Sequence, residues 1–143
     1  MFWKRKKAFD DEQKTKVADL IAEMLAVQVD IGGGSIENAE GQIIRKAIGY
    51  IYGFADCALR NIGQDMGDAS VGVPVIYQVL RRLFPEKAEE YVTFLIDNMS
   101  DERVLLGMMT GGQQYADYFC KPGREGIPMG LARVIHPSGE EEA

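Results

Sequence analysis

Apolar residues recur at intervals of three and four positions along most of the chain, which is the spacing of one face of an α-helix. The clearest such segment lies in the first half of the chain. Its apolar positions are Ile43, Ile44, Ala47, Ile48, Ile51, Phe54, Ala55, Ala58, Leu59 and Ile62. The pattern predicts a helix over about residues 35–63, with Ser35 as its N-cap, Gly63 as its C-cap and a wide buried face. Because Gly41 lies inside this range, the regular part of the helix could begin only at Gln42.

A second stripe runs along the same predicted helix. Gly49, Gly53, Asp56 and Arg60 follow one another at intervals of four, three and four residues. A glycine inside a helix costs roughly 1 kcal/mol relative to alanine. Close approach of another helix is the simplest compensation, since glycine has no side chain to obstruct it. We therefore expect Gly49 and Gly53 to lie in a helix-packing contact, within one subunit or across the two-fold axis of a dimer.

Four further helices are predicted around this central one. The first starts with a capping box at Asp10 and ends at the glycines of residues 32–34. The others start near Pro74, at Pro85 and after the N-cap Ser100. The residues expected to face inward are Val17, Leu20, Ile21, Met24, Leu25, Gln28, Val75, Ile76, Val79, Leu80, Leu83, Phe84, Ala88, Tyr91, Val92, Leu95, Ile96, Met99, Val104, Leu105, Met108, Met109, Gly112, Tyr115, Ala116 and Phe119.

The helical periodicity ends at Lys121. Residues 122–130 contain two prolines and three glycines, which is incompatible with a continuous helix. Residues 131–135 are apolar enough to form a short strand or an extended arm that packs on the other helices.

These elements predict an all-α fold, a single-domain bundle of about five helices around a buried central helix. We expect three parts along the chain. They are a basic and aromatic N-terminal arm at residues 1–9, a helical domain at 10–121 and an extended C-terminal segment with an acidic end at 122–143.

Composition and charge narrow the function classes. The chain is 46% hydrophobic and 27% charged, as expected for a globular domain. Its net charge is −6, although residues 4–7 are four consecutive cations, and three glutamates stand together at residues 140–142. The acidic remainder repels phosphate backbones, so nucleic acid is not an expected partner.

The N-terminal arm places Phe2 and Trp3 directly before Lys4 and Arg5. Aromatic residues beside cations are typical of peripheral contact with an anionic membrane surface, which is one interpretation. The other is an arm whose aromatic side chains pack on the domain or on a second subunit. No apolar run approaches the roughly twenty residues of a membrane span, and no secretory signal is recognisable. We therefore expect a cytoplasmic protein with reduced thiols.

A polar spot interrupts the central helix. Asp56 and Arg60 are one turn apart, with Tyr52 and Cys57 beside them. These four residues could bind a small ligand or the charged group of a partner. Alternatively, Asp56 and Arg60 form an intrahelical ion pair at the edge of the core.

No pattern indicates a catalytic, cofactor or metal site. Cys57 would need a base, and His136 is the single histidine in the sequence. The glycines at residues 32–34 lack the lysine of a phosphate-binding loop. Asp65 and Asp68 do not have the ligand spacing of a calcium-binding loop. No metal or cofactor is therefore expected, and an enzyme is less favoured than a binding protein.

The function expected from these observations is a non-enzymatic, cytoplasmic protein–protein interaction or regulatory module that forms a homodimer or binds another protein. The first alternative is a small-ligand-binding helical bundle or enzyme that uses Tyr52, Asp56, Cys57 and Arg60. The second is a peripheral membrane protein anchored by its N-terminal arm.

Overall fold

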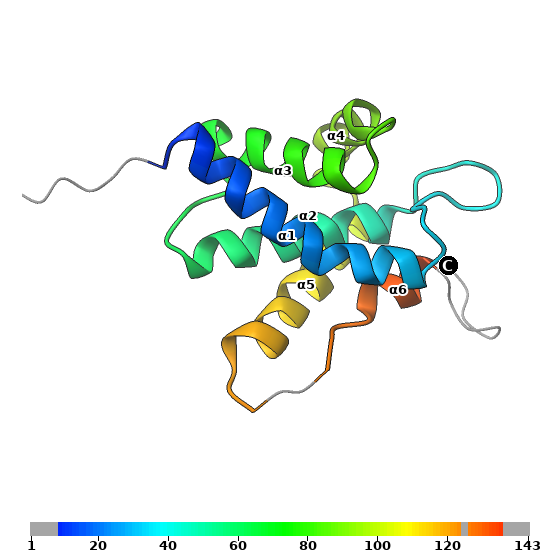
Figure 1. Cartoon of the computed structure of the whole chain (residues 1–143). Coiled ribbons are helices and arrows are strands. Elements are labelled where there is room, and N and C mark those ends of the chain that lie inside the picture. The colour runs from blue at the N-terminus through cyan, green and yellow to red at the C-terminus, as the bar shows by residue number, and fades with distance from the viewer. Residues whose placement is uncertain (1–8, 124–125, 136–143) are drawn as a thin grey trace, which may run out of the picture.

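The computed structural model describes residues 9–123 and 126–135 (Figure 1). The residues proposed for membrane contact, Phe2, Trp3, Lys4 and Arg5, lie outside the described residues, as do His136 and the glutamates at 140–142. Within the described residues the elements are α1 (Asp11–Ile31), α2 (Arg45–Asn61), α3 (Ala69–Leu83), α4 (Ala88–Asp97), α5 (Glu102–Tyr115), the π-helical turn η1 (Ala116–Cys120) and α6 (Gly130–Ile135). The all-α prediction is confirmed.

Helix α2 is the centre of the bundle. Ten of its 17 residues are buried, among them Tyr50, Ile51 and Phe54, which are fully enclosed. Helices α1 and α3 pack against each other, and α5 packs along α2 (Figure 1). None of the helices in the described part of the chain has the length and apolar character needed to cross a membrane.

The start of the central helix differs from the prediction. Residues 35–44 form a loop, and α2 begins only at Arg45. The loop closes on itself because the Ile44 N–H donates to the Ile36 carbonyl at 2.8 Å and the side chain of Ile36 is fully buried. Ser35 therefore caps the turn at Glu37, whose N–H it accepts at 3.0 Å, and does not cap the helix.

The first residues of three other helices also differ from the prediction. Asp68 accepts the Ser70 N–H, so α3 begins at Ala69 and Pro74 lies inside it. Helix α4 begins at Ala88, three residues after Pro85. Asp101, one residue after the expected cap, accepts N–H groups of the first turn of α5. The predicted capping box between Asp10 and Gln13 is present, with hydrogen bonds of 2.8 and 3.0 Å.

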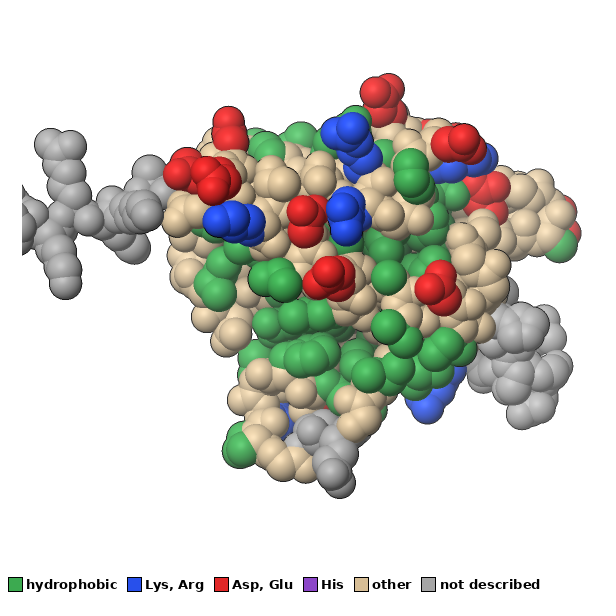
Figure 2. Space-filling model, in the orientation of Figure 1, with side chains coloured by type: hydrophobic (Ala, Val, Ile, Leu, Met, Phe, Trp, Pro, Cys, Tyr) green, Lys and Arg blue, Asp and Glu red, His purple; other side chains and the backbone are tan. Residues whose placement is uncertain are grey.

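Several residues expected to face inward are exposed. They are Leu20, Ile96, Met99, Leu105, Met109 and Phe119. The face of α5 that carries Val104, Gly107 and Gly111 packs against α2. Leu105 and Met109 therefore lie on the opposite, solvent-exposed face. On the face that carries α1, Figure 2 shows acidic and basic side chains along the upper half and an apolar band below them.

The C-terminal segment is helical where an extended arm was expected. Residues 130–135 form α6, because two side chains from other helices accept its first N–H groups. Gln114 accepts from Gly130 at 2.8 Å, and Gln28 accepts from Leu131 at 2.9 Å. These tertiary hydrogen bonds replace the caps that the local sequence does not supply.

Candidate functional site

The glycines of the central helix pack against α5 of the same chain. A Cβ atom at Gly49 would overlap the Val104 carbonyl, and one at Gly53 would overlap the Met108 carbonyl. The contact is reciprocal, because Gly107 and Gly111 on α5 approach the backbone of α2 just as closely. Two glycines on each helix, four residues apart, therefore bring the two backbones together. This surface of α2 is occupied within the subunit.

The polar spot on α2 is an intrahelical ion pair. Arg60 donates to Asp56 at 2.9 Å, and the Arg60 side chain is 72% exposed. Cys57 and Tyr52 are half-buried. Burial raises the pKa of the Cys57 thiol, helped by the nearby Cys120 and Asp56, so Cys57 is protonated and weakly nucleophilic at neutral pH. Burial also raises the pKa of Tyr52. Ligand binding at this spot stays a hypothesis.

The acidic turn after α2 has local structural roles. Asp65 accepts the N–H of Gly67 at 2.8 Å, and Asp68 caps α3. Hydrogen bonds from Ser70 lower the pKa of Asp68. Within residues 9–123 and 126–135, no cluster of three or more His, Cys, Asp or Glu side chains is placed to hold a metal ion.

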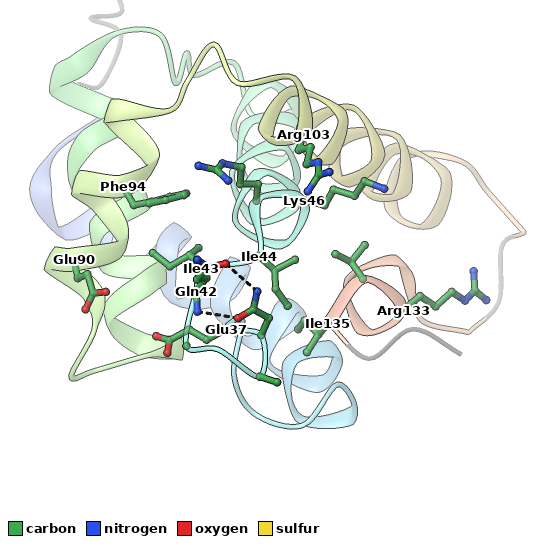
Figure 3. Close-up of a pocket in the computed structure, with 15 residues that line it drawn as sticks. Glu37, Gln42, Ile43, Ile44, Lys46, Glu90, Phe94, Arg103, Arg133 and Ile135 are labelled. Carbon is green, nitrogen blue, oxygen red and sulfur yellow. Dashed lines mark hydrogen bonds between the residues drawn. The ribbon is translucent and has the colours of Figure 1, made fainter. Parts of the chain in front are cut away.

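A pocket of about 710 Å³ lies at the other end of α2 (Figure 3). It lies between the 37–46 segment, α4, the start of α5 and α6. Its lining residues are Glu37, Asn38, Ala39, Gly41, Gln42, Ile43, Ile44, Arg45, Lys46, Glu90, Phe94, Arg103, Arg133, Val134 and Ile135. This volume falls within the range of natural ligand pockets.

The loop wall of the pocket is held by local hydrogen bonds. The side-chain oxygen of Asn38 accepts the N–H groups of Glu40 and Gln42 at 3.0 and 2.9 Å. Gly41 has a φ of +79°, a conformation that side chains disfavour. Figure 3 shows Gln42, Ile43 and Ile44 in succession along this wall. The loop is therefore an ordered part of the site.

The loop is also attached to α4. Glu37 accepts hydrogen bonds from the Tyr91 hydroxyl at 2.6 Å and from Lys87 at 3.0 Å. The hydrogen bond from Tyr91, followed by that from Lys87, lowers the pKa of Glu37. Burial, and then the Glu37 carboxylate, raise the pKa of Tyr91. Glu37 is therefore ionised and engaged in structural contacts at neutral pH.

The α6 wall depends on a buried polar network. Gln28 is fully buried and donates to the Tyr50 hydroxyl at 3.2 Å, and that hydroxyl donates to Gln114 at 2.6 Å. The two glutamines also accept the first N–H groups of α6. Burial raises the pKa of Tyr50 to about 12, so the hydroxyl remains a donor. This network positions Val134 and Ile135 against the pocket.

Four cations lie around the pocket. Arg45 pairs with Asp101 at 3.2 Å and stacks on Phe94, with its guanidinium carbon 5.6 Å from the ring centre. Lys46, Arg103 and Arg133 have no carboxylate partner among the described residues. Lys46 and Arg103 extend over the same edge in Figure 3, and Arg133 lies at the outer rim.

The start of α2 adds a further positive element. No side chain caps this helix, and no described group accepts a hydrogen bond from the N–H of Arg45 or Lys46. The first turn of a helix carries a partial positive charge that favours anions. Here the first turn holds two cations and no acidic residue. The arrangement is unfavourable for an isolated helix and suits the binding of a negatively charged group.

None of these four cations was among the candidate residues from the sequence. The signal was the Arg45–Lys46 pair, which follows the apolar Ile43–Ile44 pair. It was missed because the helix was expected to begin at residue 35, with its regular part from Gln42, so the pair was not recognised as the first turn. Arg103 and Arg133 are distant in sequence, and only the packing of α5 and α6 brings them to the same pocket.

Comparison with protein-family models, with curated proteins and with solved structures finds no match for this chain.

Proposed function

We propose that this protein is a binding module whose pocket accepts an acidic segment of a partner protein. The observation that supports the proposal is the uncapped first turn of α2, where Arg45 and Lys46 line a pocket of about 710 Å³ together with Arg103. The concentration of cations is unusual in a chain of net charge −6. These cations favour the approach of a negatively charged group to the pocket.

The layout favours a peptide with several carboxylates over a single compact anion. The cations come from α2, α5 and α6, and Arg45 is already turned toward Phe94 and Asp101. They are therefore distributed around the pocket and do not converge on one point, as recognition of a single phosphate would require. Successive acidic side chains can each meet a different cation.

Apolar surface in the pocket suits the hydrophobic part of a peptide. Ile43, Ile44, Val134 and Ile135 are half-buried residues of the lining. Isolated ion pairs at exposed sites contribute little, about 0–1 kcal/mol each. Burial of an apolar side chain contributes about 25 cal/mol per Å² of area removed from water. The expected partner segment therefore carries acidic residues next to at least one large apolar residue.

Binding of a labelled peptide with three glutamates and one leucine tests the proposal by fluorescence anisotropy. Lys46→Gln/Arg103→Gln should weaken binding about tenfold, since charge contacts of half-buried Lys46 and exposed Arg103 are removed. Lys16→Gln/Arg81→Gln on α1 and α3, which removes two exposed cations outside the pocket, should leave affinity unchanged. Equal affinity for both double variants would overturn the proposal.

A further inference from the structure

We propose that the acidic residues Glu140, Glu141 and Glu142 of this chain bind in the same pocket and compete with the partner segment. The inference rests on the proposed function and adds its regulation. Arg133, Val134 and Ile135 line the pocket, and the acidic run follows them closely in sequence. One wall of the pocket and the acidic run thus belong to one continuous stretch of chain.

The connecting chain is long enough. Glu140 stands five positions after Ile135, and an extended chain spans at most about 3.3–3.6 Å per residue. Glu140 can therefore reach about 17 Å from the rim. Pro137 and Gly139 lie within this connection, and neither favours continuation of α6 as a helix.

Charge complementarity identifies the occupant. Three consecutive carboxylates meet three cations, Lys46, Arg103 and Arg133, that have no carboxylate partner among the described residues. The backbone N–H groups of Arg45 and Lys46, which have no acceptor among the described residues, are further hydrogen-bond donors beside the pocket. Two carboxylates also line the pocket: Glu37 accepts hydrogen bonds from Tyr91 and Lys87, and Glu90 lies 3.9 Å from Lys87.

Tethering strengthens this contact. A segment on a short linker acts at an effective concentration of roughly millimolar, so weak exposed ion pairs are enough to hold it for part of the time. A partner segment must then displace it, which lowers the partner's apparent affinity. The expected reduction is about fivefold.

The test compares the full chain with Glu140→Gln/Glu141→Gln/Glu142→Gln. The probe is the labelled peptide with three glutamates and one leucine. Removal of the tail charges should tighten its binding about fivefold at low salt, and the difference should shrink as salt screens the ion pairs. Asp11→Asn/Glu12→Gln/Glu23→Gln is the control, because it removes the same charge from exposed positions of α1 outside the pocket.

A second measurement needs no peptide. Amide NMR signals of Lys46 and Arg103 should differ between the full chain and the tail variant, and should match between the full chain and the control. Unchanged signals together with unchanged peptide affinity would overturn the inference. Signals that depend on protein concentration would also overturn it, since the tail would then bind a second copy.

The two proposals can fail separately. If the peptide binds through Lys46 and Arg103 with equal affinity to the full chain and to the tail variant, the binding function stands and the tail inference is wrong. If no peptide binds to either chain but the tail variant still shifts the Lys46 and Arg103 signals, the tail occupies the pocket and the partner proposal is wrong.

Discussion

The hydroxyl of Tyr50 donates a hydrogen bond of 2.6 Å to the side chain of Gln114, which joins the central helix to the helix that lies along it. Gln114 also accepts the first N–H of α6, so this bond links the core to one wall of the pocket. The oxygen of the same hydroxyl accepts a hydrogen bond from the side chain of buried Gln28. The position of α6 therefore depends on polar groups deep in the bundle.

Tyr50→Phe should destabilise the protein by about 1–3 kcal/mol, because buried Gln28 loses its acceptor and Gln114 loses a donor. Urea unfolding measures the change. Tyr77→Phe is the control, since Tyr77 is also partly buried and no hydrogen bond of its hydroxyl to a described residue is found; its effect should be small. Equal losses from both substitutions would show that the network does not contribute to stability.

Gly53→Ala should destabilise the protein by about 1–3 kcal/mol or more, although alanine is the better helix former. The added carbon would overlap the backbone of Met108, which cannot move without separating α2 from α5. Thermal unfolding is the measurement.

Gly112→Ala provides the matched comparison. The nearest atom to a Cβ at Gly112 is the Gly53 carbonyl oxygen at 3.5 Å, an ordinary contact. Here helix propensity should dominate, and stability should rise by up to about 1 kcal/mol. A stabilising Gly53→Ala would contradict the close packing of the two backbones.

Lys46→Glu should stabilise the folded protein by about 0.3–1 kcal/mol while it weakens binding of the acidic peptide. An acidic side chain in the first turn of α2 complements the helix dipole, and the present lysine opposes it. Urea unfolding and peptide anisotropy measure the two effects.

Arg60→Glu is the control, for which the expected change in stability has the opposite sign. Arg60 lies in the last turn of the same helix and pairs with Asp56. A glutamate there should lower stability, because it faces Asp56 and the negative end of the helix. Peptide binding should not change. Loss of both stability and binding in Lys46→Glu would contradict an anion site at the start of α2.

Tyr91→Phe should make the protein less stable at neutral pH, and the difference from wild type should shrink in acid. The Tyr91 hydroxyl is the main cause of the lowered pKa of Glu37 in the folded protein. Because the pKa of Glu37 is lower in the folded protein than its value of 4.5 in the unfolded chain, the ionised carboxylate stabilises the folded state above about pH 4.5. This contribution is lost as the pH falls through the pKa of Glu37 in the folded protein.

Unfolding free energies of wild type and Tyr91→Phe between pH 3 and pH 7 check this dependence. In a Glu37→Gln background the pH dependence of the difference should disappear, because no carboxylate remains to titrate. A difference that stays constant across the pH range in the wild-type background would show that Tyr91 stabilises the fold by packing alone.

Local sequence determined the features whose partners lie within one or two helical turns. The capping box of Asp10 and Gln13, the end of α1 at the glycines and the pairing of Asp56 with Arg60 all follow from short spacings. The stripe of Gly49 and Gly53 also carried information about packing, because a glycine pair inside a helix requires a close neighbour. These interactions need no knowledge of the rest of the chain.

Tertiary structure decided which neighbour each surface meets. Leu20 and Met109 share the apolar period of their helices but are exposed, since each helix has more apolar positions than its neighbours can cover. Helix α6 exists because Gln28 and Gln114 accept its first N–H groups across 103 and 16 residues. The cationic pocket likewise joins Lys46 with Arg103. Such contacts depend on how helices dock, and periodicity along one segment contains no information about that docking.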